Sequence, residues 1–181
     1  MKWKSPTDTG WSVQIAADLS LVAIFDPAGV LRGELFPASD SEFTGHFGSW
    51  KRESTAERID RYGPALIKGK PATLQLPGVG AVSVSDGKLG AMRRRNKFCE
   101  VSVAGRQYRF EHSSGRKATA LRDGTTLARY VRAHGLRAIE VSRKSFAATD
   151  ELDECVLTLF QKVILPGREG AFSETMSALS I

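Results

Sequence analysis

One dense cluster of positive charge in this sequence has residue types and spacing suited to binding chemistry. Arg93-Arg94-Arg95-Asn96-Lys97 places four cations within five residues, directly before Phe98. Guanidinium and ammonium groups at this density can grip phosphates, either on lipid headgroups or on a nucleic-acid backbone. A solvated hairpin end has the same composition, so the cluster alone leaves both interpretations open.

The cluster belongs to a longer basic segment. From Lys88 to Lys144 there are fifteen basic and four acidic residues, a local balance of +11, whereas the whole chain of 181 residues carries +6. This asymmetry predicts a basic surface that faces an anionic partner. The candidate anion-binding residues are Arg93, Arg94, Arg95, Lys97, Arg106 and Arg109. Whether they share one face stays open, because a one-residue change of strand register reverses every side chain.

Motifs for other chemistries do not fit. Gly78-Val79-Gly80-Ala81-Val82-Ser83 approaches a dinucleotide fingerprint, but it ends in Ser and no predicted helix follows it. The three histidines, His46, His112 and His134, are too far apart for ligand pairs, and His112 is expected in the core. We therefore expect no metal, no cofactor and no catalytic residue, while an active site scattered over distant strands stays open.

The elements that would position these cations read as short strands separated by turns. From Pro71 onward the predicted strands are Ala72–Leu76, Val82–Val84, Leu89–Met92, Cys99–Val103, Tyr108–Phe110, Ala118–Leu121, Thr125–Arg132 and Leu136–Val141. Asp86-Gly87 and Asp123-Gly124 predict hairpin turns, since both central residues of a type I′ turn need positive φ. Thr125–Arg132 also fits helical spacing, but the turn signals on both sides favour a strand.

The N-terminal part repeats the pattern less regularly. Trp11, Val13 and Ile15 alternate; Leu19–Phe25 is an apolar run, and the turn signal Asp26-Pro27-Ala28-Gly29 connects it to a returning strand at Val30–Phe36. With a further run at 45–50, the chain offers about nine to twelve strands, while the polar segment 54–62 fits a short helix or a loop. Such a series is typical of an antiparallel meander that is closed or nearly closed.

The pattern changes once, after Ser145. Asp150-Glu151-Leu152-Asp153-Glu154 supplies four acids to a first helical turn, where the helix dipole favours them, and Pro166-Gly167 ends the apolar stretch that follows. The predicted helix, about 149–165, is apolar nearly all round and must be surrounded. We predict a mainly β fold: an antiparallel β-barrel with a hydrophobic C-terminal helix in or across it, in one domain (1–170) with a tail (171–181).

Composition narrows the setting. The start of the chain leads into Asp8 rather than an apolar stretch, so no signal peptide is expected, and the run 155–165 is too short and polar to span a bilayer. Two cysteines cannot build a disulfide framework, so Cys99 and Cys155 are expected to be buried thiols in a reducing compartment. We therefore expect a cytoplasmic protein, with a peripheral membrane location as a further interpretation.

The many short strands, the Arg122-Asp123-Gly124 hairpin and the acid-led apolar helix resemble the tubby C-terminal-like superfamily. That superfamily includes the phospholipid scramblases and the LURP-one-related proteins. The resemblance covers roughly Ala65 to Leu165 and is architectural. It implies about twelve strands wrapped around a hydrophobic C-terminal helix, and a ligand-binding or membrane-associated scaffold rather than an enzyme.

Together these observations predict a non-enzymatic scaffold that binds an anionic ligand or an acidic phospholipid surface through Arg-rich strands. The alternatives are a nucleic-acid-binding protein that uses the same cations and a structural subunit with a protein partner. Tyr108, Phe110 and Tyr130 would stack on bases if they faced outward. Strand alternation places Tyr108 and Phe110 on the apolar face, which counts against the nucleic-acid interpretation.

Overall fold

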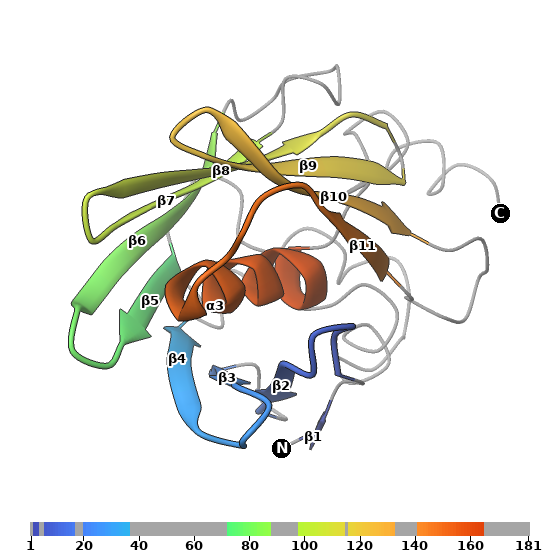
Figure 1. Cartoon of the computed structure of the whole chain (residues 1–181). Helices are drawn as coiled ribbons and strands as arrows, with labels where there is room; N and C mark the ends of the chain where they lie inside the picture. The colour runs from blue at the N-terminus through green and yellow to red at the C-terminus, as the bar shows by residue number, and fades with distance from the viewer. Residues whose placement is uncertain are drawn as a thin grey trace, which may run out of the picture.

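The computed structural model describes residues 2–3, 6–16, 20–36, 72–87, 98–114, 116–132 and 141–164. In these ranges eleven strands form one antiparallel sheet, in which each strand pairs with its neighbour in the chain. The strands are β1 (Lys2–Trp3), β2 (Ser12–Ile15), β3 (Val22–Phe25), β4 (Leu31–Phe36), β5 (Ala72–Leu76), β6 (Gly80–Gly87), β7 (Phe98–Val103), β8 (Arg106–His112), β9 (Lys117–Arg122), β10 (Thr125–Arg132) and β11 (Val141–Ser145). Figure 1 shows this sheet bending around helix α3 (Glu151–Leu159), which continues as the π-helical segment η2 (Phe160–Ile164).

The predicted antiparallel, mainly β fold with a C-terminal helix is therefore confirmed. The β9–β10 turn has the expected positive φ angles, 51° at Asp123 and 79° at Gly124. The Asp123 carboxylate also accepts a hydrogen bond from the backbone N–H of Gln107 at 2.8 Å, which ties this turn to β8. The segment that fitted both periods, Thr125–Arg132, is a strand, because its backbone pairs with β9 on one side and β11 on the other.

Two predicted boundaries were wrong. Asp86-Gly87 is not a turn: β6 runs through it, pairing Asp86 with Cys99 and Gly87 with Phe98. A second strand beside it offers the backbone a full ladder, which overrides the local turn preference of Asp-Gly. The last strand spans Val141–Ser145, beyond the predicted run 136–141. The runs predicted at 45–50 and 89–92 and the tail 171–181 lie outside the described residues.

The core lies between the concave face of the sheet and the helix. Along β8 every second side chain points inward, so Tyr108, Phe110 and His112 are buried. The ring of Phe110 stacks on Phe160 of η2 at 4.7 Å and meets the edge of Tyr130 at 5.6 Å. His112 is thus a core histidine, as predicted, and the aromatic residues considered for base stacking face the helix instead.

Helix α3 is surrounded, as its sequence requires. All seven residues from Asp153 to Leu159 are buried, and Cys99 and Cys155 are buried, as predicted, and form no disulfide. The helix begins with a capping box: the Asp150 side chain accepts from the backbone N–H of Asp153 at 2.9 Å, and the Asp153 side chain accepts from that of Asp150 at 3.0 Å. The predicted range of about 149–165 is confirmed as far as residue 164, with its last turn wound as η2.

The two ends of the sheet are joined by helix side chains. Within the described residues β1 and β11 do not pair with each other. Gln161 donates its amide N–H to the carbonyl of Val141 in β11 at 2.7 Å, and Lys162 donates to the carbonyl of Pro6, ahead of β2, at 3.1 Å. The helix therefore contacts both the last strand, β11, and the segment that precedes β2. None of the described helices has the length and apolar character needed to cross a membrane.

Candidate anion-binding surface

The two described arginines of the predicted site lie on opposite faces of β8. Arg106 is on the inner face with Tyr108, whereas Arg109 is on the outer face. Both are engaged by carboxylates. Arg106 pairs with Asp150 at 2.6 Å and Asp153 at 3.1 Å, and Arg109 pairs with Glu100 at 3.0 Å and Glu111 at 2.7 Å. The other four predicted residues, Arg93, Arg94, Arg95 and Lys97, lie outside the described residues.

Arg106 belongs to an inner cluster at the start of the helix. The Asp153 carboxylate is fully buried and accepts hydrogen bonds from Tyr108 Oη at 2.7 Å, from Arg106 at 3.1 Å and from Arg122. The hydrogen bond from Arg106 lowers the pKa of the neighbouring Asp150 to about 2. Burial, followed by the hydrogen bond to Asp153, raises the pKa of Tyr108, so this phenol stays neutral. The acids of the first helical turn, which we expected from the helix dipole, are thus also the counterions of inward-facing arginines.

A second inner ion pair ties β11 to the helix. Arg143, whose side chain is 1% exposed, donates two hydrogen bonds to Glu154, at 2.6 and 2.8 Å. Thr149 at 2.6 Å and Thr9 at 3.0 Å donate to the same carboxylate. Burial is the largest effect on the pKa of Glu154 and raises it, but the hydrogen bonds from Arg143 and Thr149 outweigh burial, so the pKa lies below its usual value. These inner arginines stabilise the fold.

The outer face of β9–β11 carries cations of a different kind. Lys117, Arg129 and Lys144 are exposed on neighbouring strands, and in the part of the chain that the structure describes none of them pairs with a carboxylate. Two exposed apolar side chains lie among them, Val131 (39% exposed) and Phe146 (47% exposed). We call these five residues the outer basic face.

Strand register holds the outer basic face together. Arg129 of β10 lies directly opposite Lys144 of β11, and Val131 lies opposite Lys117 of β9. Since adjacent strands are about 4.8 Å apart, the three cations lie within roughly 10 to 12 Å of one another. Two like charges in directly opposed positions destabilise a strand pair. This arrangement costs folding free energy in the free protein, and a bound anion would relieve that cost.

Phe146 is held against these cations. Its backbone N–H donates to the carbonyl of Leu127 at 2.8 Å, which continues the β10–β11 ladder by one residue. The guanidinium of Arg129 lies 4.8 Å from the centre of the ring, and the ammonium of Lys144 lies 5.5 Å from it. Such exposed cation–π contacts are worth about 0.5–1 kcal/mol each. They fix the ring at the surface without burying it.

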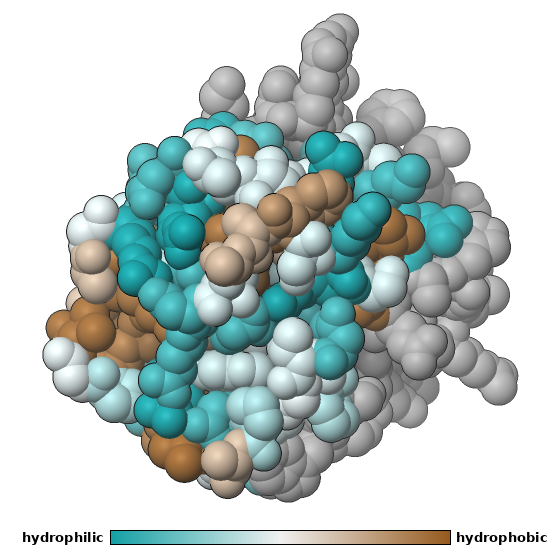
Figure 2. Space-filling model, viewed as in Figure 1, coloured by the Kyte–Doolittle hydropathy of each residue, from teal (hydrophilic) through white to brown (hydrophobic). Residues whose placement is uncertain are grey.

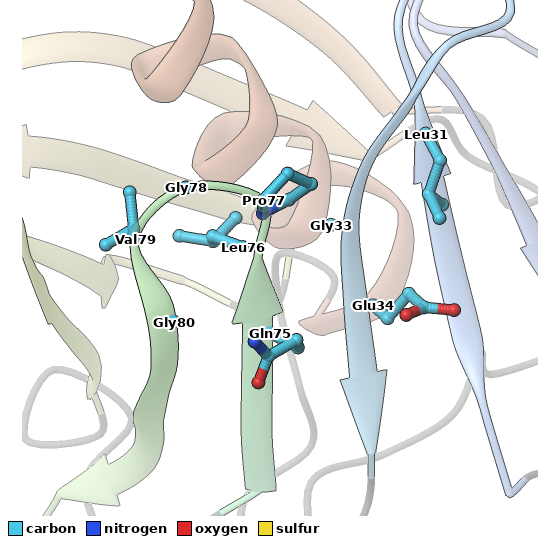
Figure 3. A pocket seen from close by; sticks show the side chains of 9 residues that line it. All are labelled: Leu31, Gly33, Glu34, Gln75, Leu76, Pro77, Gly78, Val79 and Gly80. Carbon is cyan, nitrogen blue, oxygen red and sulfur yellow. The ribbon is translucent and has the colours of Figure 1, made fainter.

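A shallow hollow of about 360 Å³ lies elsewhere, between the start of β4 and the β5–β6 turn. Figure 3 shows Leu76, Pro77 and Val79 at the end of β5 and in the β5–β6 turn, beside Gly33 of β4. A Cβ at Gly33 would meet Cys155 Sγ at 3.1 Å and Leu76 Cδ2 at 3.2 Å, so glycine here lets β4 pack closely on the helix. In Figure 2 hydrophobic residues gather over the β5–β6 hairpin.

Sequence reasoning missed part of this surface. From the sequence, we emphasised the densest run of arginines. In the structure, the strand face on which a cation lies decides whether it is exposed and available. Lys117, Arg129 and Lys144 alternate with inward residues such as Ala118, Tyr130 and Arg143, and that alternation was the available signal.

The described residues contain no group of three or more His, Cys, Asp or Glu side chains that could hold a metal ion. Comparisons with protein-family models, with curated proteins and with solved structures found no match for this chain.

Proposed function

We propose that this protein is a non-enzymatic scaffold that binds an anionic partner through the outer basic face. The observation that carries the proposal is the opposed pair of Arg129 and Lys144, two exposed cations with no carboxylate partner among the described residues. Elsewhere on the same sheet, a cation on the outer surface is neutralised: Arg109 lies between Glu100 and Glu111. Positive charge that is left uncompensated is available to a ligand.

The proposal shifts the centre of the predicted site along the sheet. Arg106 serves the helix N-terminus and Arg109 is already paired, so we assign neither of them a primary role in ligand binding. The cluster of Arg93, Arg94, Arg95 and Lys97 precedes β7 in the chain. It stays in the proposal on the strength of its sequence, as a second contribution to the same positive potential.

A comparison of two single variants tests this proposal. Arg129→Ser and Arg109→Ser remove the same residue type and the same net charge from the outer face, but of the two only Arg129 has no carboxylate partner among the described residues. On a column of a sulfated polysaccharide such as heparin, we expect the wild-type protein to be retained. Arg129→Ser should elute at clearly lower salt, and Arg109→Ser close to the wild type. Equal elution of both variants, or no retention of the wild type, would contradict the proposal.

Nucleic acid is the second candidate partner, because phosphates would bind to the same cations. The three aromatic residues first considered for stacking, Tyr108, Phe110 and Tyr130, are all fully buried. Phe146 is the remaining aromatic residue on the outer basic face. A role as a structural subunit would instead leave the protein unretained on any polyanion, and would direct attention to protein partners.

We also propose that the sheet closes as a barrel around α3, which is the architecture that the resemblance to the tubby C-terminal-like superfamily implies. The curvature in Figure 1 and the burial of Asp153–Leu159 in α3 support this, as do the hydrogen bonds from Gln161 and Lys162 to the two ends of the sheet. In a closed barrel the β11 amides that face away from β10 are hydrogen-bonded. Slow hydrogen exchange of those amides would support closure, and exchange at the rate of an unpaired edge would contradict it.

The setting that we propose is the cytoplasm. The two buried thiols, Cys99 and Cys155, form no disulfide, which supports a reducing compartment. Burial raises the pKa of Cys155 to about 12, so this thiol stays protonated and unreactive. Expression of the tagged chain with fractionation of cytosol and membranes tests the location, and recovery outside the cytoplasm would contradict it.

A further inference from the structure

The outer basic face combines its cations with exposed apolar side chains. Phe146 and Val131 point outward from the ends of β11 and β10, although nothing in the described part of the chain covers them. Val131 lies opposite Ser142 on β11 and opposite Lys117 on β9, so it stands among polar neighbours rather than at the edge of the core. An apolar side chain in that position gains nothing from a purely ionic ligand.

We infer that the partner of the outer basic face is the interface of an acidic lipid bilayer, with Phe146 and Val131 inserted among the acyl chains and Lys117, Arg129 and Lys144 on the headgroups. This inference rests on the proposed function and adds the class of partner. A peripheral membrane surface needs two contributions, apolar area that leaves water and cations that meet anionic headgroups. Both are present here on three adjacent strands.

The geometry favours a bilayer over a soluble polyanion. The charged groups of Arg129 and Lys144 lie 4.8 and 5.5 Å from the centre of the Phe146 ring, so both cations contact the exposed aromatic side chain. At a bilayer surface the ring would reach below the headgroups while the cations stay at their level, because long basic side chains keep their charge at the interface. A nucleic acid offers phosphates to the cations but no apolar layer for Val131.

The chain provides a matched control for Phe146. Phe36, at the end of β4, is 42% exposed against 47% for Phe146, and no cation lies over its ring among the described residues. Phe36→Ser therefore removes the same side chain and a similar exposed area far along the sheet. Neither Phe36→Ser nor Phe146→Ser changes the net charge of the protein.

The first experiment is co-sedimentation with phosphatidylcholine vesicles that contain or lack phosphatidylserine, beside titration with a single-stranded DNA oligonucleotide. We expect binding to the acidic vesicles, weakened about fivefold to tenfold by Phe146→Ser and little changed by Phe36→Ser. Arg129→Ser should weaken vesicle and DNA binding alike, whereas Phe146→Ser should leave any DNA binding unchanged. Thermal unfolding of each variant shows that the fold is retained.

A second measurement reports insertion directly. Because both native thiols are buried, Phe146→Cys and Phe36→Cys each offer one accessible thiol for an environment-sensitive dye such as NBD. On acidic vesicles the dye at residue 146 should brighten and shift to the blue, while the dye at residue 36 keeps its emission in water.

The outcomes separate this inference from the proposed function. Vesicle binding that depends on Arg129 but not on Phe146, with no change in the dye at residue 146, would overturn the lipid inference and leave the anion-binding proposal standing. Binding to DNA alone would also overturn it, in favour of nucleic acid. A protein that binds neither vesicles nor DNA would overturn the lipid inference, and one that is also not retained on the heparin column would overturn both.

Discussion

Arginine has different roles on the two faces of the β10–β11 pair. Arg143 points inward, is 1% exposed and makes a two-pronged ion pair with Glu154 of the helix. Arg129, on the adjacent strand, points outward, lies opposite Lys144 and has its guanidinium over Phe146. A count of arginines treats the two alike. Their partners distinguish them: the Glu154 carboxylate neutralises Arg143, whereas no carboxylate among the described residues pairs with Arg129, whose charge is therefore available to a ligand.

The largest effect should come from breaking the inner ion pair. Arg143→Ala leaves Glu154 in a buried site without its strongest donor, and removal of one partner from a buried pair typically costs about 3–5 kcal/mol. Urea unfolding followed by circular dichroism measures the change. Arg129→Ala, the matched variant on the outer face, should change the free energy of unfolding by less than about 0.5 kcal/mol. Equal losses in the two variants would erase the distinction between the faces.

The inner cluster at Asp153 should rank second. Asp153→Asn keeps the shape of the side chain but removes the charge that meets Arg106 and Arg122, and we expect a loss of about 2–3 kcal/mol. Tyr108→Phe removes only one donor, at 2.7 Å, and should cost about 1 kcal/mol. Both are measured by the same unfolding experiment. If Asp153→Asn proves neutral, its arginines do not need this carboxylate and the inner cluster is not structural.

A pH series examines the same contrast without a change of shape. Because the pKa of Glu154 is lower in the folded protein than its usual 4.5, the stability that its ionised form contributes is present above about pH 4.5. That stability is lost as the pH falls through the lowered folded pKa. Glu154→Gln should therefore flatten the fall in unfolding free energy below pH 4.5 relative to the wild type. Parallel curves for the two proteins would contradict this role of Glu154.

The fold was more predictable than the site, for a physical reason. Alternation of apolar and polar residues predicted β5, β7 and β8, because a strand with one buried face must alternate between the two residue types. Acids followed by an apolar stretch gave the helix. Strand alternation also places Arg106 on the inner face with Tyr108 and Arg109 on the outer face. Register is different, since it depends on pairing between distant residues: nothing local placed Arg129 opposite Lys144. Asp86-Gly87 failed for the same reason, because a neighbouring strand overrode its turn preference.

The smallest expected effect on stability, and the largest on binding, belongs to the outer basic face. Lys117→Ser, Arg129→Ser and Lys144→Ser remove no ion pair present among the described residues. Removal of the opposed Arg129–Lys144 pair also relieves a like-charge contact. We expect the midpoint of thermal unfolding of the triple variant to stay within about 2 °C of that of the wild type.

The most direct test of the account combines both properties in one preparation. The triple variant and the wild type are compared by thermal unfolding and by binding to vesicles that contain phosphatidylserine. The account predicts an unchanged unfolding midpoint together with a loss of vesicle affinity of more than about tenfold, as expected for three headgroup contacts at about 1 kcal/mol each. Unchanged affinity, or a loss of affinity that accompanies a loss of stability, would contradict the claim that the outer cations bind while the inner arginines hold the fold.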